Sequence, residues 1–141
     1  MTNLSTRERA EGALWGLFLG DALAMPVHWY YDRAALVRDY GEVRDLVAPQ
    51  NPHPGSILFR SRYEPVNEDA DILHDQARFW GRHGVHYHQV LAAGENTLDL
   101  HLVRLALATI DEVGRYAPDL YLHRMVAFMR DPASHRDTYV E

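Results

Sequence analysis

Apolar residues recur at helical spacing in several stretches of the chain, and no set of stretches shows the alternation typical of strands. The clearest amphipathic stretch covers residues 97–113, where charged residues lie off one apolar stripe. A second apolar stretch, residues 6–24, follows an S-x-x-E capping box at Ser5 and stops before Pro26. The other predicted helices cover residues 32–40, 69–81, 87–93 and 118–130. The sequence therefore predicts an all-α fold.

A long stretch without helical pattern, residues 41–67, separates these helices. Its prolines are Pro49, Pro52, Pro54 and Pro65. Proline interrupts helices and central strands alike, so we expect a proline-rich loop here, in which residues 57–59 could form a brief extended piece. A connection of this length inside a compact domain is unusual and is often functional or mobile.

The helix predicted over residues 6–24 carries apolar side chains around most of its circumference, so we expect it to lie centrally in the fold. Gly12, Gly16 and Gly20 repeat at four-residue spacing on one face. Each costs about 1 kcal/mol relative to alanine, which close approach of another backbone would offset. Two interpretations stay open: tight helix packing alone, or a helix end that also borders a site through Asp21.

The composition excludes several kinds of catalytic group and metal site. The 141 residues contain no cysteine, and all 14 basic residues are arginine, which excludes thiolate nucleophiles, cysteine-based metal sites and lysine Schiff bases. A net charge of −6 argues against nucleic acid and anionic membranes as partners. The most apolar run is too short to span a bilayer and lacks the basic start of a signal peptide, so we expect a cytoplasmic protein.

The polar cluster at residues 94–99 and the isolated Asp21 are candidates for function. Residues 94–99 form a predicted loop-to-helix junction with two interpretations. In the structural one, Asn96 or Thr97 caps the helix and Asp99 faces its positive end. In the functional one, Thr97 and Asp99 offer hard oxygen ligands to Mg²⁺ or Mn²⁺. The histidines at positions 83, 86, 88 and 101 lack the spacing of a metal site. Asp21, inside an apolar run, requires a hydrogen-bonding partner or an open helix end.

A longer motif carries a resemblance. Residues 12–26 follow the pattern G-A-x-x-G-x-x-x-G-D-A-x-x-x-P, which resembles the opening signature of the ADP-ribosylglycohydrolase family. The segments from His86 to Leu98 and from His135 to Tyr139 look like one branch of that family. The resemblance extends over essentially the whole chain, although the loop at 41–67 matches only loosely.

This resemblance implies an all-α orthogonal bundle of helices that binds a pair of Mg²⁺ or Mn²⁺ ions. It also implies metal-assisted hydrolysis of the glycosidic bond to ADP-ribose or a related ribosyl group on a small molecule or protein. Thr97 and Asp99 match the family's T-D-D metal motif, and Asp99 with Asp21 would be catalytic. Substrate-binding candidates are Glu95, Asn96 and His28.

The chain also departs from the family pattern. Leu98 replaces the middle aspartate of the metal motif, and His28 replaces an acidic residue that often follows the first helix. No D-x-D-[TS] motif for the second ligand set follows Thr97. We therefore expect residues 1–141 to form one partial domain, the N-terminal portion of such a hydrolase. The alternatives are a non-catalytic member that binds a nucleotide-like ligand or a protein, and a portion that self-associates through exposed apolar surface.

Overall fold

The structure, a computed structural model, describes residues 3–138, and these contain helices but no strand. The α-helices are α1 (Thr6–Ala24), α2 (Arg33–Tyr40), α3 (Leu98–Val113) and α4 (Pro118–Arg130). Short 3₁₀ turns connect them: η1 (Met25–Val27), η2 (Leu58–Arg60), η3 (Glu68–Ala70) and η4 (His74–Phe79). The predicted all-α fold is confirmed, and no helix among residues 3–138 is long and apolar enough to cross a bilayer.

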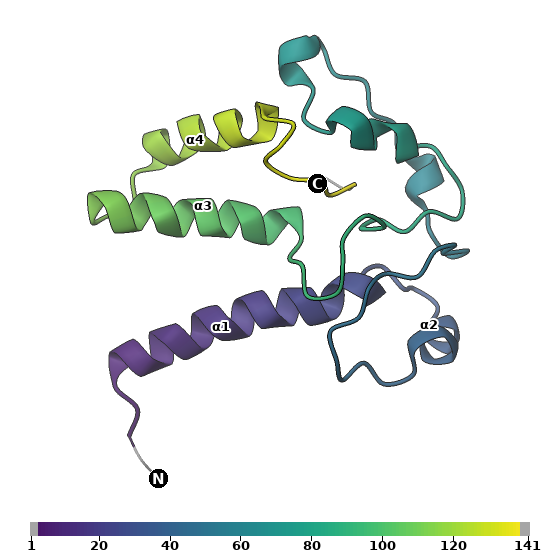
Figure 1. The fold of residues 1–141 in the computed structure, drawn as a ribbon, viewed down its shortest axis with the longest axis horizontal. Helices are drawn as coiled ribbons and strands as arrows, with labels where there is room; N and C mark the ends of the chain where they lie inside the picture. Colours follow the sequence, from purple (N-terminus) through teal and green to yellow (C-terminus); the bar gives the residue numbers. More distant parts are fainter. Residues whose placement is uncertain (1–2, 139–141) are drawn as a thin grey trace.

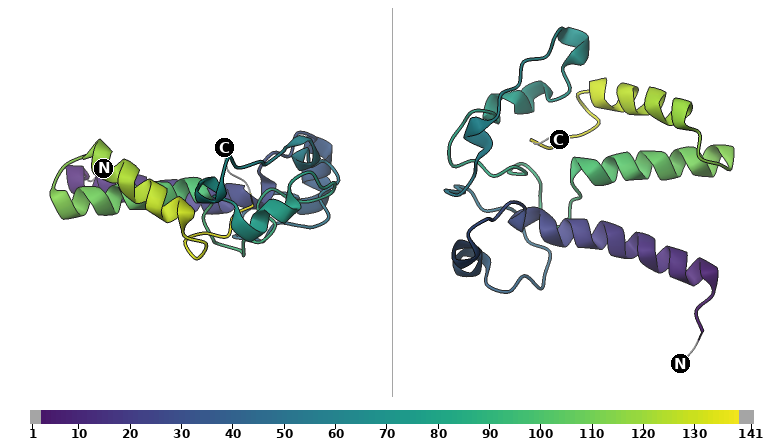
Figure 2. Two further views of the ribbon diagram at one scale, coloured as in Figure 1. Left: turned by 90° about the horizontal axis from the view of Figure 1, so that it is seen from above. Right: turned by 180° about the vertical axis from the view of Figure 1, so that it is seen from behind.

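The three long helices lie roughly in one layer, with α3 between α1 and α4 (Figure 1). Seen from above, this layer is thin (Figure 2). Helix α2 and the 3₁₀ turns gather at one end, beside the last turn of α1 and the first turn of α3. Most of the buried side chains belong to this end, among them Met25, Leu58, Leu73, Tyr87 and Leu98. The core therefore sits where the two helix ends meet.

Local signals set the ends of the helices as the sequence predicts. The Ser5 hydroxyl oxygen accepts from the Glu8 amide, and the Glu8 carboxylate accepts from the Ser5 amide, which completes the capping box. Asp32 caps α2 by accepting from two backbone amides. Gly114, at φ 72°, ends α3 in the left-handed region that glycine tolerates, and Pro118 begins α4.

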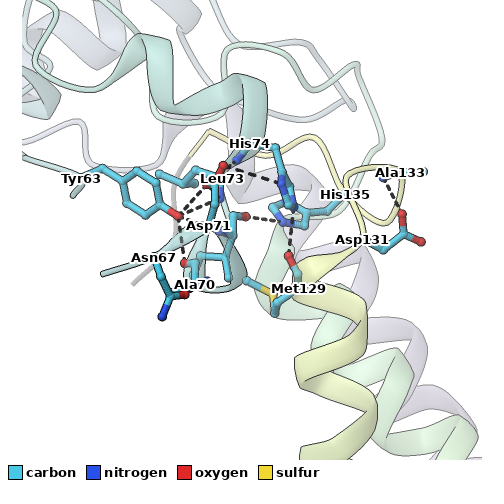
Figure 3. Close-up of polar contacts among 11 residues, drawn as sticks. Tyr63, Asn67, Ala70, Asp71, Leu73, His74, Met129, Asp131, Ala133 and His135 are labelled. Atoms are coloured by element: carbon cyan, nitrogen blue, oxygen red, sulfur yellow. Dashed lines mark hydrogen bonds and ion pairs between the residues drawn. The ribbon is translucent and has the colours of Figure 1, made fainter. Parts of the chain in front are cut away.

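The helix predicted over residues 69–81 is wrong, because this segment forms the separate turns η3 and η4. The Tyr63 hydroxyl accepts from the amides of Ile72 and Leu73, and the Asp71 carboxylate accepts from those of Leu73 and His74. Figure 3 shows this cluster around Asp71. Side chains thus satisfy the amides that an α-helix would use, and the chain turns instead.

Two shorter predictions are also wrong. Residues 87–93 form isolated turns, because His86 and His88 hold distant parts of the chain rather than sharing a helix face. Residues 57–59 are not extended: the Ser56 hydroxyl accepts from the Leu58 amide, and the 3₁₀ turn η2 follows.

Helix α1 is not central among the described residues, contrary to expectation. Ala22 is the buried residue of this helix, whereas Leu14, Trp15, Leu17 and Leu19 are exposed. A Cβ atom added at Gly12, Gly16 or Gly20 would meet nothing within 4 Å, so no backbone of residues 3–138 approaches the glycine face. On α4, the apolar residues Leu122 and Val126 are likewise exposed. These faces remain open because the chain folds around the helix ends.

Candidate functional site

Asp21, in the last turn of α1, holds the start of α3. Its carboxylate accepts from the Thr97 amide at 2.8 Å, the Thr97 hydroxyl at 2.7 Å and the Asn96 side-chain amide at 2.9 Å. The Asn96 amide also donates to the carbonyl of Phe18, one turn earlier in α1, at 2.7 Å. The partner that the sequence requires for Asp21 is therefore the 96–97 junction, and structural hydrogen bonding by Asp21 is confirmed.

A second carboxylate reaches the same helix end. Asp137 is 2% exposed, and its Oδ2 accepts from the Leu98 amide at 3.0 Å. Thr97 occupies the cap position, as one of the two predicted candidates, but its side chain makes no capping hydrogen bond because its hydroxyl donates to Asp21. Two carboxylates from distant segments thus satisfy the amides of the cap residue Thr97 and of Leu98, the first residue of α3, where the helix dipole favours negative charge.

Asp137 also begins a chain of imidazoles. Its Oδ1 lies 2.7 Å from Nδ1 of His88, and Nε2 of His88 lies 2.6 Å from Nδ1 of His28. The rings of His28 and His88 are within 8° of parallel. His88 is buried, whereas His28 is half-buried, so this series of side chains runs from the interior toward the surface. This series of contacts is called the imidazole array below.

His86 lies beside the imidazole array and makes hydrogen bonds of its own to the backbone. Its Nε2 lies 3.0 Å from the Pro26 carbonyl oxygen, and its Nδ1 accepts from the His88 amide at 3.0 Å. Because a carbonyl only accepts, Nε2 carries the proton and Nδ1 is the acceptor. Burial is the main reason that the pKa of His86 falls to about 3, and the nearby His88 and His53 lower it further. His86 is therefore neutral in the folded protein.

A cavity of about 270 Å³ opens beside Asp137 and the start of α3. It is lined by Leu91, Glu95, Asn96, His101 and residues 132–137. Glu95 accepts from the Arg136 guanidinium at 2.6 Å and from the Ala92 amide at 2.6 Å. Burial alone would raise the pKa of Glu95, but these two hydrogen bonds outweigh it and the pKa is lowered. The ion pair fixes one wall of the cavity.

The structure brings together most of the residues that the sequence singles out. Asp21, Asn96 and Thr97 are in direct contact, and Glu95 lines the same cavity as Asn96. The imidazole array connects His28 with Asp137, which contacts the start of the same helix. Asp99 is exposed on the first turn of α3 and has no hydrogen bond to the residues that the structure describes.

Asp137 is a site residue that sequence reasoning does not identify. Spacing alone cannot interpret the H-R-D-T-Y run at residues 135–139, and its resemblance to one family branch is the signal that marks it. Tyr139 lies outside the described residues. The contact between Asp137 and Leu98 joins segments 39 residues apart, which local pattern cannot predict.

The fold and site define an all-α protein whose carboxylates, amides, a hydroxyl and imidazoles converge where two helix ends meet. The model of the ADP-ribosylglycohydrolase family matches residues 2–139, and the chain belongs to this family. Its members act on ADP-ribosylated substrates and are generally metal-dependent. No match was found among curated proteins or solved structures.

Proposed function

We propose that this chain belongs to a hydrolase that cleaves the glycosidic bond between ADP-ribose, or a related ribosyl group, and a small molecule or protein. The observation that carries the proposal is the contact of Asp21 with Asn96 and Thr97. It joins the family's signature helix to the segment that matches its metal motif, in a chain that belongs to the family. Glu95 and Asn96 line the adjoining cavity and are the proposed substrate-binding groups.

The proposed metal is Mg²⁺ or Mn²⁺, with oxygen ligands from Thr97 and Asp99. The Thr97 hydroxyl donates to Asp21, so its oxygen keeps lone pairs, and the exposed Asp99 carboxylate is a hard ligand. Within residues 3–138, however, no group of three or more histidine or acidic side chains is arranged to hold a metal. These residues therefore supply a partial ligand set, and Asp99 is the charged member of it.

Metal binding tests this assignment directly. Replacing Asp99 with alanine is expected to weaken Mn²⁺ binding about tenfold or more, because the site loses its charged oxygen ligand. Isothermal titration of Mn²⁺ and Mg²⁺ into the full gene product measures this. Asp111→Ala removes an exposed carboxylate from the same helix and should bind like the wild type. Equal affinity of the wild type and Asp99→Ala would remove Asp99 from the ligand set.

A non-catalytic binding function is the second candidate. Leu98 stands where the family motif has its middle aspartate, and its side chain is 3% exposed. A buried leucine offers no ligand atom to a metal. Incubating the Mn²⁺-loaded protein with peptides ADP-ribosylated on arginine or serine distinguishes the two functions. Released ADP-ribose supports the hydrolase, whereas titratable ADP-ribose binding without release supports the non-catalytic alternative.

We also propose that the chain self-associates through the exposed face of α1. Trp15 is 76% exposed beside the open glycine face, so burying it between two copies is favourable. Analytical ultracentrifugation is expected to show a mass that rises with concentration, and Trp15→Glu is expected to lower it. Val66→Asp changes an apolar residue of similar exposure outside α1 and is the control. A wild type that is monomeric at every concentration contradicts the proposal.

A further inference from the structure

A second cavity, of about 390 Å³, lies beside α2 and shares no lining residue with the cavity described above. Its volume is typical of pockets that bind small organic ligands. Its wall combines aromatic rings, charged groups and one imidazole, which belong to Tyr30, Tyr31, Asp32, Arg38, Asp39 and His53. None of these residues is assigned to hydrolysis. This space is called the α2 cavity below.

His53 is a buried imidazole in the wall of the α2 cavity. The residue is 2% exposed, and neither ring nitrogen has a hydrogen-bond partner among residues 3–138. The backbone of His53 fixes its position, because its amide donates to the Gly84 carbonyl at 2.8 Å and its carbonyl accepts from the Ser56 amide at 3.0 Å. An unpaired buried polar group destabilises a fold, so a ligand that pairs with it gains the interaction that the chain leaves unmade.

The ring of His53 is directed toward the α2 cavity. One face lies against Tyr30, with the ring centroids 4.3 Å apart and the planes 30° apart. The edge with Cε1 and Nε2 faces Gly55, where an added Cβ would lie 3.4 Å from Cε1 and 3.9 Å from Nε2. Gly55 also lines the cavity, and as glycine it places no side chain over this edge. The Nε2 edge is therefore on the side from which a ligand approaches.

The charges around the α2 cavity largely cancel. Arg38 donates to both oxygens of the Asp39 carboxylate, at 2.8 and 3.2 Å, and the Tyr30 hydroxyl donates to it at 3.3 Å. Asp32 accepts from two α2 amides through Oδ1, which leaves Oδ2 free among the described residues. Burial lowers the pKa of His53, so its ring is neutral at pH 7. Two carboxylates disfavour a phosphate and Arg38 disfavours a simple cation, so a neutral ligand fits best.

We propose that the α2 cavity binds a neutral heteroaromatic ring of the nucleobase type and that His53 is the hydrogen-bonding partner of this ring. A neutral imidazole has one donor and one acceptor, so it can pair with an amino group or a ring nitrogen on the edge of a base. Tyr31 is 70% exposed, and a nucleobase has a flat face that stacks on such a ring. The free Oδ2 of Asp32 can accept from an amino group. Two sources share this chemistry, a free nucleoside and the adenine of ADP-ribose.

Adenosine is the first probe, titrated into the ¹⁵N-labelled full gene product and followed by ¹H–¹⁵N NMR. We expect saturable shifts of the amides of residues 31–35 and 53–55, and their absence overturns the proposal. His53→Phe keeps a flat ring against Tyr30 but removes both nitrogens, so the Kd for adenosine is expected to rise about tenfold. The Tm should stay the same or rise, because an unpaired buried group is removed. A folded His53→Phe protein with an unchanged Kd overturns the proposal.

A variant that fills the α2 cavity tests the location without altering His53. Ala35→Leu enlarges a lining residue on α2 and is expected to raise the Kd for adenosine about tenfold or more. Ala34→Leu makes the same change at the neighbouring exposed position, which does not line the cavity, and should bind like the wild type. Equal Kd values for the wild type and Ala35→Leu place adenosine elsewhere and overturn the proposal even if His53→Phe does not fold.

ADP-ribose and ribose 5-phosphate distinguish the sources of the base. If ADP-ribose displaces adenosine and binds Ala35→Leu more weakly, the α2 cavity holds the adenine of ADP-ribose, a result that also rests on the proposed function. If adenosine binds without such competition, the ligand is a separate base or nucleoside, and both results support the proposal. Ribose 5-phosphate that shifts the same amides and displaces adenosine shows a phosphate site instead and overturns it. Since hydrolysis is not measured, failure of the proposed function leaves the adenosine result intact.

Discussion

Replacing Asp21, the α1 residue that holds the start of α3, with alanine is expected to lower the free energy of unfolding by about 2–4 kcal/mol. Three donors from Asn96 and Thr97 lose their acceptor at once. Thr97 is buried, so water replaces Asp21 poorly at its amide. Urea unfolding followed by far-ultraviolet circular dichroism measures the change.

Two variants make this result specific. Asp21→Asn keeps one oxygen acceptor but turns an NH₂ group toward one of the three donors, so an intermediate loss of about 1–2 kcal/mol is expected. Asp99→Ala removes an exposed carboxylate from the same junction and should change stability by less than about 0.5 kcal/mol. If Asp21→Ala and Asp99→Ala unfold at the same urea concentration, Asp21 does not hold the start of α3.

The sequence predicts Asp21 as a special position but not its partner. A carboxylate inside an apolar run requires compensation, and that argument needs no structure. The partner lies 76 residues away in sequence, so spacing along the chain cannot identify it. The resemblance to the family draws attention to the segment that contains Asn96 and Thr97, and the contact with Asp21 gives these two residues a structural role.

Helix ends are predicted well where the signal is local. The Ser5 capping box, Asp32, Gly114 and Pro118 each act on amides or dihedral angles within a few residues, and each marks an end as expected. The apolar spacing over residues 69–81 predicts a helix that does not form, because the hydroxyl of Tyr63, outside that segment, accepts from the amides of Ile72 and Leu73. Distant side chains override local pattern there.

The prediction that α1 lies centrally in the fold is wrong for a different reason. Apolar residues around the helix predict that every face is covered, but pattern does not say what covers them. In the described part of the chain, the last turn of α1 contacts residues 96–97, whereas Trp15 and the glycine face of α1 remain open. The same limit applies to Leu122 and Val126 of α4.

Stability is expected to fall by about 2 kcal/mol between pH 7.5 and pH 5 through His86 alone. Burial lowers its pKa to about 3, whereas an unfolded histidine titrates near 6.5. Between these values the unfolded chain binds a proton that the folded chain excludes, so the free energy of unfolding falls as pH falls, by about 1.4 kcal/mol per unit below 6.5. Burial also lowers the pKa of His53, His101 and His135, which adds loss of the same sign.

Between pH 7.5 and pH 5, the pH dependence of stability comes from histidines and not from the carboxylates of Glu95 and Asp71. Glu95 and Asp71 have lowered pKa values, so their contribution to stability persists throughout this range and is lost only at lower pH. Urea unfolding at half-unit pH steps gives the slope. His86→Gln keeps an amide donor for the Pro26 carbonyl but cannot titrate, so it should flatten the slope by up to about 1.4 kcal/mol per unit. His123→Gln, at an exposed position on α4, should retain the full slope. Stability that is constant or rises toward pH 5 would show that His86 is charged or hydrated in the folded protein, against its burial between Pro26 and His88.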